Sequence, residues 1–186
     1  NPNAQSLTTF AHPDAIIVMY VYEKKTIIDR WDRQRVRQAL NSDDALTPDE
    51  TRTLPFEFDH AALTEGGVLA FSSDQSLYAC DLSKSVAEPK LISTGFKESD
   101  LHKIVSLEAT DDLTVVGYKQ DERHYFSPIA FYFGKLTEGA DPIVERIPWG
   151  EARRIAINGQ WVVVYKARGD SDLYKADYKT KKVSHI

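Results

Sequence analysis

A short segment built around a tyrosine occurs three times in this chain, and it constrains the fold more than any other feature. Each copy reads apolar, tyrosine, variable, small, polar, apolar, and the copies occupy residues 77–82, 131–136 and 173–178. Their tyrosines, Tyr78, Tyr132 and Tyr174, are spaced 54 and then 42 residues apart. Stacked structural repeats often have periods of roughly 40–50 residues. The chain is therefore expected to fold as a series of similar units.

The surroundings of the three copies also agree. An apolar run and a polar turn precede each copy, and a further strand candidate lies on either side. Short apolar runs bounded by turn residues are typical of buried strands. The candidates, four per unit in chain order, are residues 60–63, 68–71, 77–82 and 90–93; 104–107, 113–118, 131–136 and 143–147; 154–157, 161–165, 173–178 and 182–186.

The first unit is less regular than the other three. It has a strong strand candidate at residues 15–22 and a second beginning at residue 26. Residues 29–40 are predicted to be helical, because Trp31 and the apolar residues around it gather towards one side. Thr47-Pro48-Asp49-Glu50 has the spacing of a capping box, so a second helical turn is predicted there. Residues 29–50 are therefore interpreted as an insertion into the first unit.

The last unit carries the clearest resemblance to a known family. Residues 158–165 (NGQWVVVY) followed by 169–177 (GDSDLYKAD) resemble a β-propeller repeat of the bacterial type, in which an apolar strand, a polar turn and an Asp-Leu-Tyr-x-x-Asp strand recur. The resemblance implies an all-β, propeller-like fold of about four four-stranded antiparallel blades, with a short helical insertion in the first. Residues 1–186 would form one such domain, or a segment of a larger propeller. A β-sandwich is the alternative, because short strands with regular turns fit it equally well.

Charge and composition exclude some classes of function. The net charge of −5 disfavours nucleic-acid binding, which requires a basic face. No apolar stretch approaches the ~20 residues of a membrane span. Cys80 is the single cysteine, so it forms no internal disulfide, and it is interpreted as a small core residue. The chain begins Asn1-Pro2-Asn3; a removed signal peptide would leave such a start, which makes an exported or periplasmic location one alternative.

Motif searches identify no catalytic residue, metal site or cofactor site. Neither a nucleophile elbow nor a phosphate-binding glycine motif occurs, and no two of the five histidines lie within four residues of each other. Residues 39–50 have partial EF-hand spacing, but Asp44 stands where the loop needs glycine. Residues 168–170 spell Arg-Gly-Asp, which is also common turn composition.

These observations favour a non-enzymatic binding module for a protein partner. The predicted contact surface lies in the insertion, because Arg and Trp often carry interface energy; its residues are Arg30, Trp31, Arg33, Arg35 and Arg37. Alternatively, Trp31 and Val36 cap the first blade and the arginines are solvated. The turn at residues 120–127 is the next candidate. Three alternatives stay open: a hydrolase or carbohydrate-active enzyme with its site in a central channel, a structural segment of a larger propeller, and a small-molecule ligand.

Overall fold

Four antiparallel sheets of four strands follow one another along the chain. The structure, a computed structural model, describes residues 5–40, 45–82, 88–93, 103–119, 128–139, 141–146, 152–158, 161–166, 172–177, 180 and 182–185. The strands are β1 (Gln5–Ala11), β2 (Ala15–Tyr22), β3 (Lys25–Asp32) and β4 (Glu50–Leu54) in the first sheet; β5 (His60–Leu63), β6 (Val68–Ser73), β7 (Ser76–Asp81) and β8 (Lys90–Ser93) in the second; β9 (Lys103–Ala109), β10 (Leu113–Lys119), β11 (Pro128–Phe133) and β12 (Ile143–Arg146) in the third; and β13 (Ala152–Asn158), β14 (Trp161–Lys166), β15 (Asp172–Asp177) and β16 (Lys182–His185) in the fourth.

Each sheet is a simple meander in which consecutive strands pair. The three apolar runs predicted as central strands are β6, β10 and β14, each in the interior of its sheet. Residues 60–63 and 90–93 were predicted as outer strands, and the observed strands β5 and β8 have the same bounds. The β-sandwich alternative is wrong, because a sandwich contains two sheets and the described residues form four.

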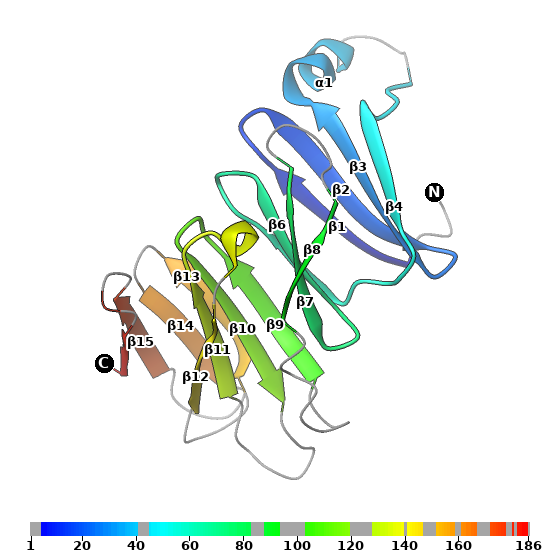
Figure 1. Cartoon of the computed structure of the whole chain (residues 1–186). Coiled ribbons are helices and arrows are strands. Elements are labelled where there is room, and N and C mark those ends of the chain that lie inside the picture. The colour runs from blue at the N-terminus through cyan, green and yellow to red at the C-terminus, as the bar shows by residue number, and fades with distance from the viewer. Residues whose placement is uncertain are drawn as a thin grey trace.

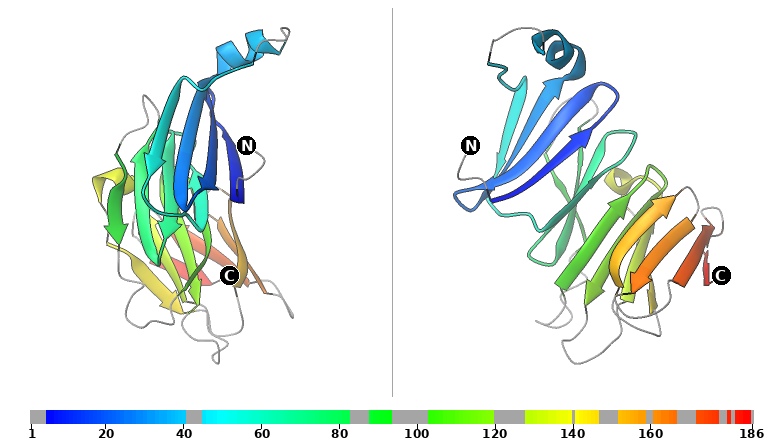
Figure 2. Two further views of the ribbon diagram at one scale, coloured as in Figure 1. Left: turned by 90° about the vertical axis from the view of Figure 1, so that its right-hand side faces the viewer. Right: turned by 180° about the vertical axis from the view of Figure 1, so that it is seen from behind.

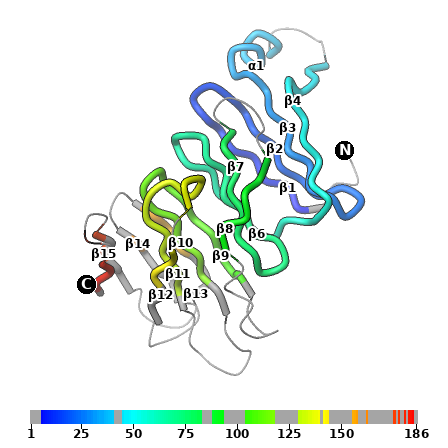
Figure 3. Tube along the Cα trace, in the orientation of Figure 1, coloured from blue at the N-terminus to red at the C-terminus, as the bar shows by residue number. Residues whose placement is uncertain are grey.

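The sheets stack face to face along an arc, with the N-terminus at one end and the C-terminus at the other (Figures 1 and 2). Three apolar clusters fill the spaces between consecutive sheets. Met19 and Leu69 lie between the first and second sheets, Leu77 and Tyr132 between the second and third, and Phe131 and Ile155 between the third and fourth. Figure 3 follows the chain along this series. The architecture is propeller-like, and its stability comes from burial between neighbouring sheets.

Burial along the strands follows from this stacking. β2 alternates strictly between buried and half-buried residues, because only one face of the first sheet is covered by a neighbour. β6 lies between two sheets, and five of its six residues are buried. A strand covered on both faces reads as a continuous apolar run, which is why β6 and β10 were recognisable in the sequence.

The predicted helix at residues 29–40 begins too early. β3 continues to Asp32, and the helix α1 covers only Arg33–Ala39. Asp29 and Arg30 pair with both β2 and β4, so sheet hydrogen bonds outweigh the helical pattern. The predicted helical turn after Thr47 is also wrong, because Glu50 begins β4 opposite Arg30. The insertion is therefore the connection between β3 and β4, residues 33–49.

The predicted equivalence of the three tyrosines holds only in part. Tyr132 is fully buried, whereas Tyr78 is partly buried. Their positions along the strands also differ: Tyr78 lies opposite Phe71 in the middle of β6, and Tyr132 lies opposite Thr114 near the start of β10. Both belong to the cluster that faces the preceding sheet. For Tyr174 the backbone register, opposite Val162, is described.

The two ends of the stacked sheets carry different connections. The turns at residues 12–14, 64–67 and 110–112 lie at one end, together with α1 and the short 3₁₀ helix η2 (Leu136–Glu138) (Figure 1); we call this the helix end. The turns at residues 23–24 and 74–75 and the connection 55–59 lie at the other end, which we call the cavity end.

Candidate functional site

Helix α1 projects from the first sheet beyond the end of β3 (Figures 1 and 2). It begins where Asp32 leaves the sheet, because the Asp32 carboxylate accepts hydrogen bonds from the backbone N–H groups of Gln34 (2.9 Å) and Arg35 (3.0 Å). A capping residue of this kind contributes about 1 kcal/mol to a helix. No residue of α1 is buried. The helix is therefore formed without contributing to the core.

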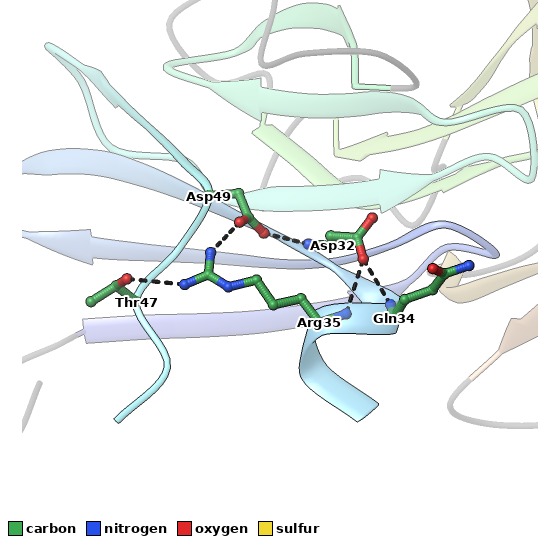
Figure 4. Close-up of polar contacts among 5 residues, drawn as sticks. All are labelled: Asp32, Gln34, Arg35, Thr47 and Asp49. Carbon is green, nitrogen blue, oxygen red and sulfur yellow. Dashed lines mark hydrogen bonds and ion pairs between the residues drawn. The ribbon is translucent and has the colours of Figure 1, made fainter. Parts of the chain in front are cut away.

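A set of polar contacts fixes α1 against Thr47 and Asp49, in the segment that leads into β4 (Figure 4). The Arg35 guanidinium forms an ion pair with the Asp49 carboxylate and donates a hydrogen bond to the Thr47 hydroxyl (3.5 Å). The Asp49 carboxylate also accepts a hydrogen bond from the backbone N–H of Asp32 (2.6 Å). This backbone hydrogen bond and the Arg35 guanidinium lower the pKa of Asp49.

Arg33 anchors the first turn of α1 to the neighbouring strands. Its backbone N–H donates to the carbonyl of Asp14 (3.0 Å), and its guanidinium donates to the carbonyl of His12 (3.2 Å). The backbone N–H of Asp14 donates to Nδ1 of His12 (3.3 Å), so the proton of the neutral ring lies on Nε2, which donates to the carbonyl of Glu65 (3.0 Å). Arg33 is thus part of the frame that joins the first and second sheets.

The same series of hydrogen bonds reaches the third sheet. Gly66 follows Glu65, and its backbone N–H donates to the Asp111 carboxylate (2.7 Å). A side chain at this position would collide with that carboxylate, since a Cβ atom on Gly66 would lie 2.7 Å from Asp111 Oδ1. The turns of three successive sheets are therefore hydrogen-bonded to one another at the helix end.

The five residues predicted as one contact surface do not form one patch. Arg30 pairs with Ile17 in β2 and with Glu50 in β4, on the face turned towards the second sheet. Its Nε atom is buried without a hydrogen-bond partner among the described residues. Trp31 pairs with Ile16 on the opposite, outer face. Arg33, Arg35 and Arg37 lie on α1, where Arg33 and Arg35 hold the helix in place.

The exposed residues of α1 and its C-terminus include the cation Arg37 and the large apolar residue Leu40. Arg37 lies in the last turn and is exposed. Leu40 caps the helix, and its side chain is 78% exposed. Arginine is among the residue types that most often carry interface energy, so Arg37, with Leu40 three residues further on, is the candidate contact point of α1.

A cavity of about 600 Å³ at the cavity end was not found from the sequence. It is lined by Lys24, Phe56, Glu57, Asp59, His60, Ser73, Asp74, Gln75 and Ile104. Its lining residues Lys24, Asp74 and Gln75 lie in hairpin turns. Because the residues that line the cavity come from three sheets, their convergence is a property of the stacking and not of any local motif.

The enzyme alternative requires carboxylates and a histidine that converge at one end of the stacked sheets. Glu57, Asp59, Asp74 and His60 meet this condition, but the three carboxylates are exposed. A carboxyl group acting as a general acid normally needs an apolar surrounding to remain protonated near neutral pH. The cavity therefore fits ligand binding better than acid–base chemistry.

Metal and thiol chemistry receive no support from the part of the chain that the structure describes. Within these residues no three His, Cys, Asp or Glu side chains are grouped so as to hold a metal ion. Cys80 is 1% exposed and lies in the core cluster of the first two sheets, as predicted. Burial raises the pKa of its thiol to about 12. Residues 168–170, residues 120–127 and residues 41–44 of the EF-hand-like segment lie outside the described residues.

Comparison with known proteins supports the fold and does not identify a family. No family model matches the chain, and no curated protein matches it. Among solved structures, the WD40 domain of SCAP from fission yeast superposes with a TM-score of 0.50 at 7% sequence identity. The match covers 98% of this chain and 51% of that domain, so the chain spans about half of its length. Neither helix in the described residues is long and apolar enough to cross a membrane.

Proposed function

We propose that this chain is a protein-interaction module that presents helix α1 to a partner. The observation that carries this proposal is that α1 buries none of its residues and is nevertheless held by contacts with the rest of the chain. Asp32 and Arg33 fix its start, and the Arg35–Asp49 ion pair fixes its side. A helix of this length is marginal in isolation, so the surrounding contacts maintain a structure that packing does not require.

The chemistry of the exposed part of α1 defines what the partner surface should contain. Arg37 would pair with a carboxylate of the partner, and Leu40 would enter a small apolar depression. Arg33 and Arg35 act as positioning residues in this proposal, because their side chains are engaged within the chain. A helix already fixed in its bound conformation loses less entropy on association.

Paired charge reversals test the proposal. The wild-type chain is used to isolate a partner by affinity capture and mass spectrometry, and its dissociation constant is then measured with purified components. Arg37→Glu combined with Leu40→Ser should weaken binding at least tenfold, or about 1.4 kcal/mol. Lys25→Glu, an equal charge change on an exposed residue at the other end of the same sheet, should leave affinity unchanged. Equal losses in both variants, or no specific partner, would refute the role of α1.

A second candidate function, as a structural segment of a larger propeller, is supported by the outer face of the first sheet. Ile16, Val18 and Tyr20 of β2 alternate with the buried residues and are only half-buried. Ile27 lies opposite Tyr20, and so does Leu7, which is 65% exposed. An apolar face that crosses three strands is the kind of surface that a neighbouring blade covers.

The carboxylate of Asp29 on this face already has a hydrogen-bond donor within the same sheet. Asp29 is 8% exposed and accepts a hydrogen bond from the Thr51 hydroxyl (2.6 Å). Burial, together with the charge of Asp29 and a hydrogen bond to it, raises the pKa of Tyr20. A further sheet could therefore pack here without leaving this carboxylate without a hydrogen-bond donor.

The size of the native polypeptide tests this second candidate. An antibody raised against the chain should detect, in the cells that produce it, a polypeptide well above the 21.0 kDa of these 186 residues. A native species of 21.0 kDa would contradict the larger propeller. That result would leave the α1 proposal untouched, because the two functions use different surfaces.

A further inference from the structure

We propose that the cavity at the cavity end binds a basic segment of a polypeptide, with an arginine or lysine side chain seated against Phe56. This goes beyond the proposed function of α1, because α1 lies at the helix end and shares no residue with the cavity. The volume of about 600 Å³ lies within the range of roughly 300–1,000 Å³ that is typical of ligand sites.

Three successive sheets build the cavity. Lys24 lies in the turn between β2 and β3, and Asp74 and Gln75 form the turn between β6 and β7. Phe56, Glu57 and Asp59 belong to the connection from the first sheet to the second. Ile104, 7% exposed, lies at the start of β9 and supplies an apolar surface from the third sheet. The cavity thus depends on the stacking of the sheets.

Phe56 gives the cavity an aromatic wall that is fixed in advance. Its ring stacks on Tyr78 with centroids 5.1 Å apart, and Tyr78 stacks in turn on the buried ring of Phe71 at 5.3 Å. The backbone of Phe56 is held as well, because its carbonyl accepts hydrogen bonds from the N–H (2.8 Å) and the hydroxyl (2.7 Å) of Thr26. A half-buried ring held in this way can receive a cation on its open part.

The charge of the cavity selects a cationic occupant. Glu57, Asp59 and Asp74 supply three carboxylates, and Lys24 supplies the one ammonium group among the lining residues. Within the described part of the chain, no ion pair involves any of these three carboxylates. A guanidinium or ammonium group would gain charge-assisted hydrogen bonds to them, whereas an anionic ligand would be repelled.

Two of the lining residues have a backbone conformation that glycine adopts with less strain than other residues. Lys24 and Gln75 have φ values of 61° and 63°. Two-residue hairpin turns with left-handed backbone favour glycine or asparagine, because a Cβ atom is unfavourable there. Replacing Lys24 by glycine therefore removes a charge and relieves the backbone together, which makes it a useful test residue.

Capped peptides of five residues provide the probe. One carries two arginines, a second two lysines, and a third two glutamines at the same positions. The arginine and lysine peptides should bind saturably in calorimetry, with affinity that falls as salt rises. When either peptide is added to ¹⁵N-labelled protein, the largest changes in amide chemical shift should occur at Lys24, Glu57–His60 and Ser73–Gln75. Equal binding of the glutamine peptide, or shifts centred elsewhere, would overturn the proposal.

Two pairs of substitutions should affect peptide binding differently. Asp59→Asn combined with Asp74→Asn should weaken binding of the arginine peptide at least tenfold. The matched control is Glu65→Gln combined with Asp112→Asn, which removes two exposed carboxylates at the helix end and should change affinity less than twofold. If both pairs lose affinity equally, the effect comes from the net charge of the protein, and the proposed binding site is wrong.

Lys24→Gly should bind the arginine peptide more tightly than wild type, because the competing ammonium group is gone. Glu23→Gly is its control in the same turn: Glu23 also has a positive φ of 49° but does not line the cavity. Both variants should unfold at higher temperature, and only Lys24→Gly should gain affinity. An affinity lowered by Lys24→Gly would refute a cationic occupant. The α1 variant Arg37→Glu should bind the peptide normally, which separates this test from that of the proposed function.

Discussion

Gly117 is where the stacking of the third and fourth sheets can be tested most directly. It lies in β10, buried and facing β13, opposite Ser106 in β9. A Cβ atom at this position would lie 2.5 Å from the Ser106 hydroxyl oxygen and 2.8 Å from Cδ1 of Ile155. Both distances are shorter than van der Waals contact, so Gly117→Ala requires the neighbours to move.

The expected cost is the difference between two effects. Replacing glycine by alanine in a strand stabilises the backbone by about 0.5–1 kcal/mol. Forcing an extra methyl group into a packed interface costs about 1–3 kcal/mol. Gly117→Ala should therefore lower the free energy of unfolding by about 0.5–2 kcal/mol, although an exposed strand glycine replaced in the same way would raise it.

Denaturant unfolding followed by circular dichroism measures this cost. The comparison uses Ser106→Ala with Ile155→Val, which removes both colliding atoms. Ile155→Val alone should cost about 0.5–1.5 kcal/mol. Ser106→Ala should cost little, because the Ser106 hydroxyl is buried without a partner among the described residues. In this double background, Gly117→Ala should be neutral or stabilising, giving a coupling energy of at least ~0.5 kcal/mol.

Additive effects would refute the reasoning. If Gly117→Ala costs the same in both backgrounds, its Cβ atom does not meet Ser106 and Ile155. The third and fourth sheets would then not pack in the observed register. If Gly117→Ala stabilises the wild-type chain, the position is open to solvent, and the face between these sheets is not an interface.

Three further predictions follow from burial and charge. Tyr132→Ala should destabilise the chain by about 3–5 kcal/mol in thermal or denaturant unfolding, and clearly more than Tyr78→Ala, because Tyr132 is fully buried and Tyr78 is not; equal effects would contradict this difference. Cys80 should not react with a thiol reagent at pH 8 until the chain unfolds, since burial raises its pKa to about 12; rapid reaction of the native chain would show that the first two sheets separate. Asp49→Asn should speed hydrogen exchange of the α1 amides. Acid should have the same effect on the wild type, because the pKa of Asp49 is lowered in the folded chain. The stabilisation of α1 by the Asp49 carboxylate is therefore present above pH ~4 and is lost as pH falls through the lowered pKa. Because Asp49 is a surface group, global stability should change by less than ~1 kcal/mol, and unchanged α1 exchange would show that the ion pair does not hold the helix.

Much of the secondary structure was predictable from local patterns. Central strands covered on both faces need apolar residues throughout, so β6 and β10 appear as continuous apolar runs. The hairpin turns are marked by polar residues between such runs. The repeat of these patterns indicated four units, and the described residues form four sheets. In the first sheet, β1 and β4 were not identified from the sequence.

The first sheet shows where local patterns fail. Residues 29–32 have the charges and spacing of a helix, yet they continue β3. All four residues pair with β2, and Asp29 and Arg30 pair with β4 as well. This pairing decides their conformation, and the partners in β4 lie up to 22 residues away. The helix begins only where β3 leaves the sheet and Asp32 can cap it.

The candidate sites depend still more on tertiary structure. Sequence reasoning grouped Arg30, Trp31 and Arg37 because they are close in the chain, but alternation along β3 sends the first two to opposite faces, and the third lies on α1. The cavity residues Lys24, Phe56, Asp74 and Ile104 are distant in sequence and meet through stacking. The sequence by itself indicated the strands of the second, third and fourth sheets, because backbone pairing and burial leave a local signature. Which side chains come together was decided by the packing of one sheet on the next, because neighbours across an interface have no fixed separation in the chain.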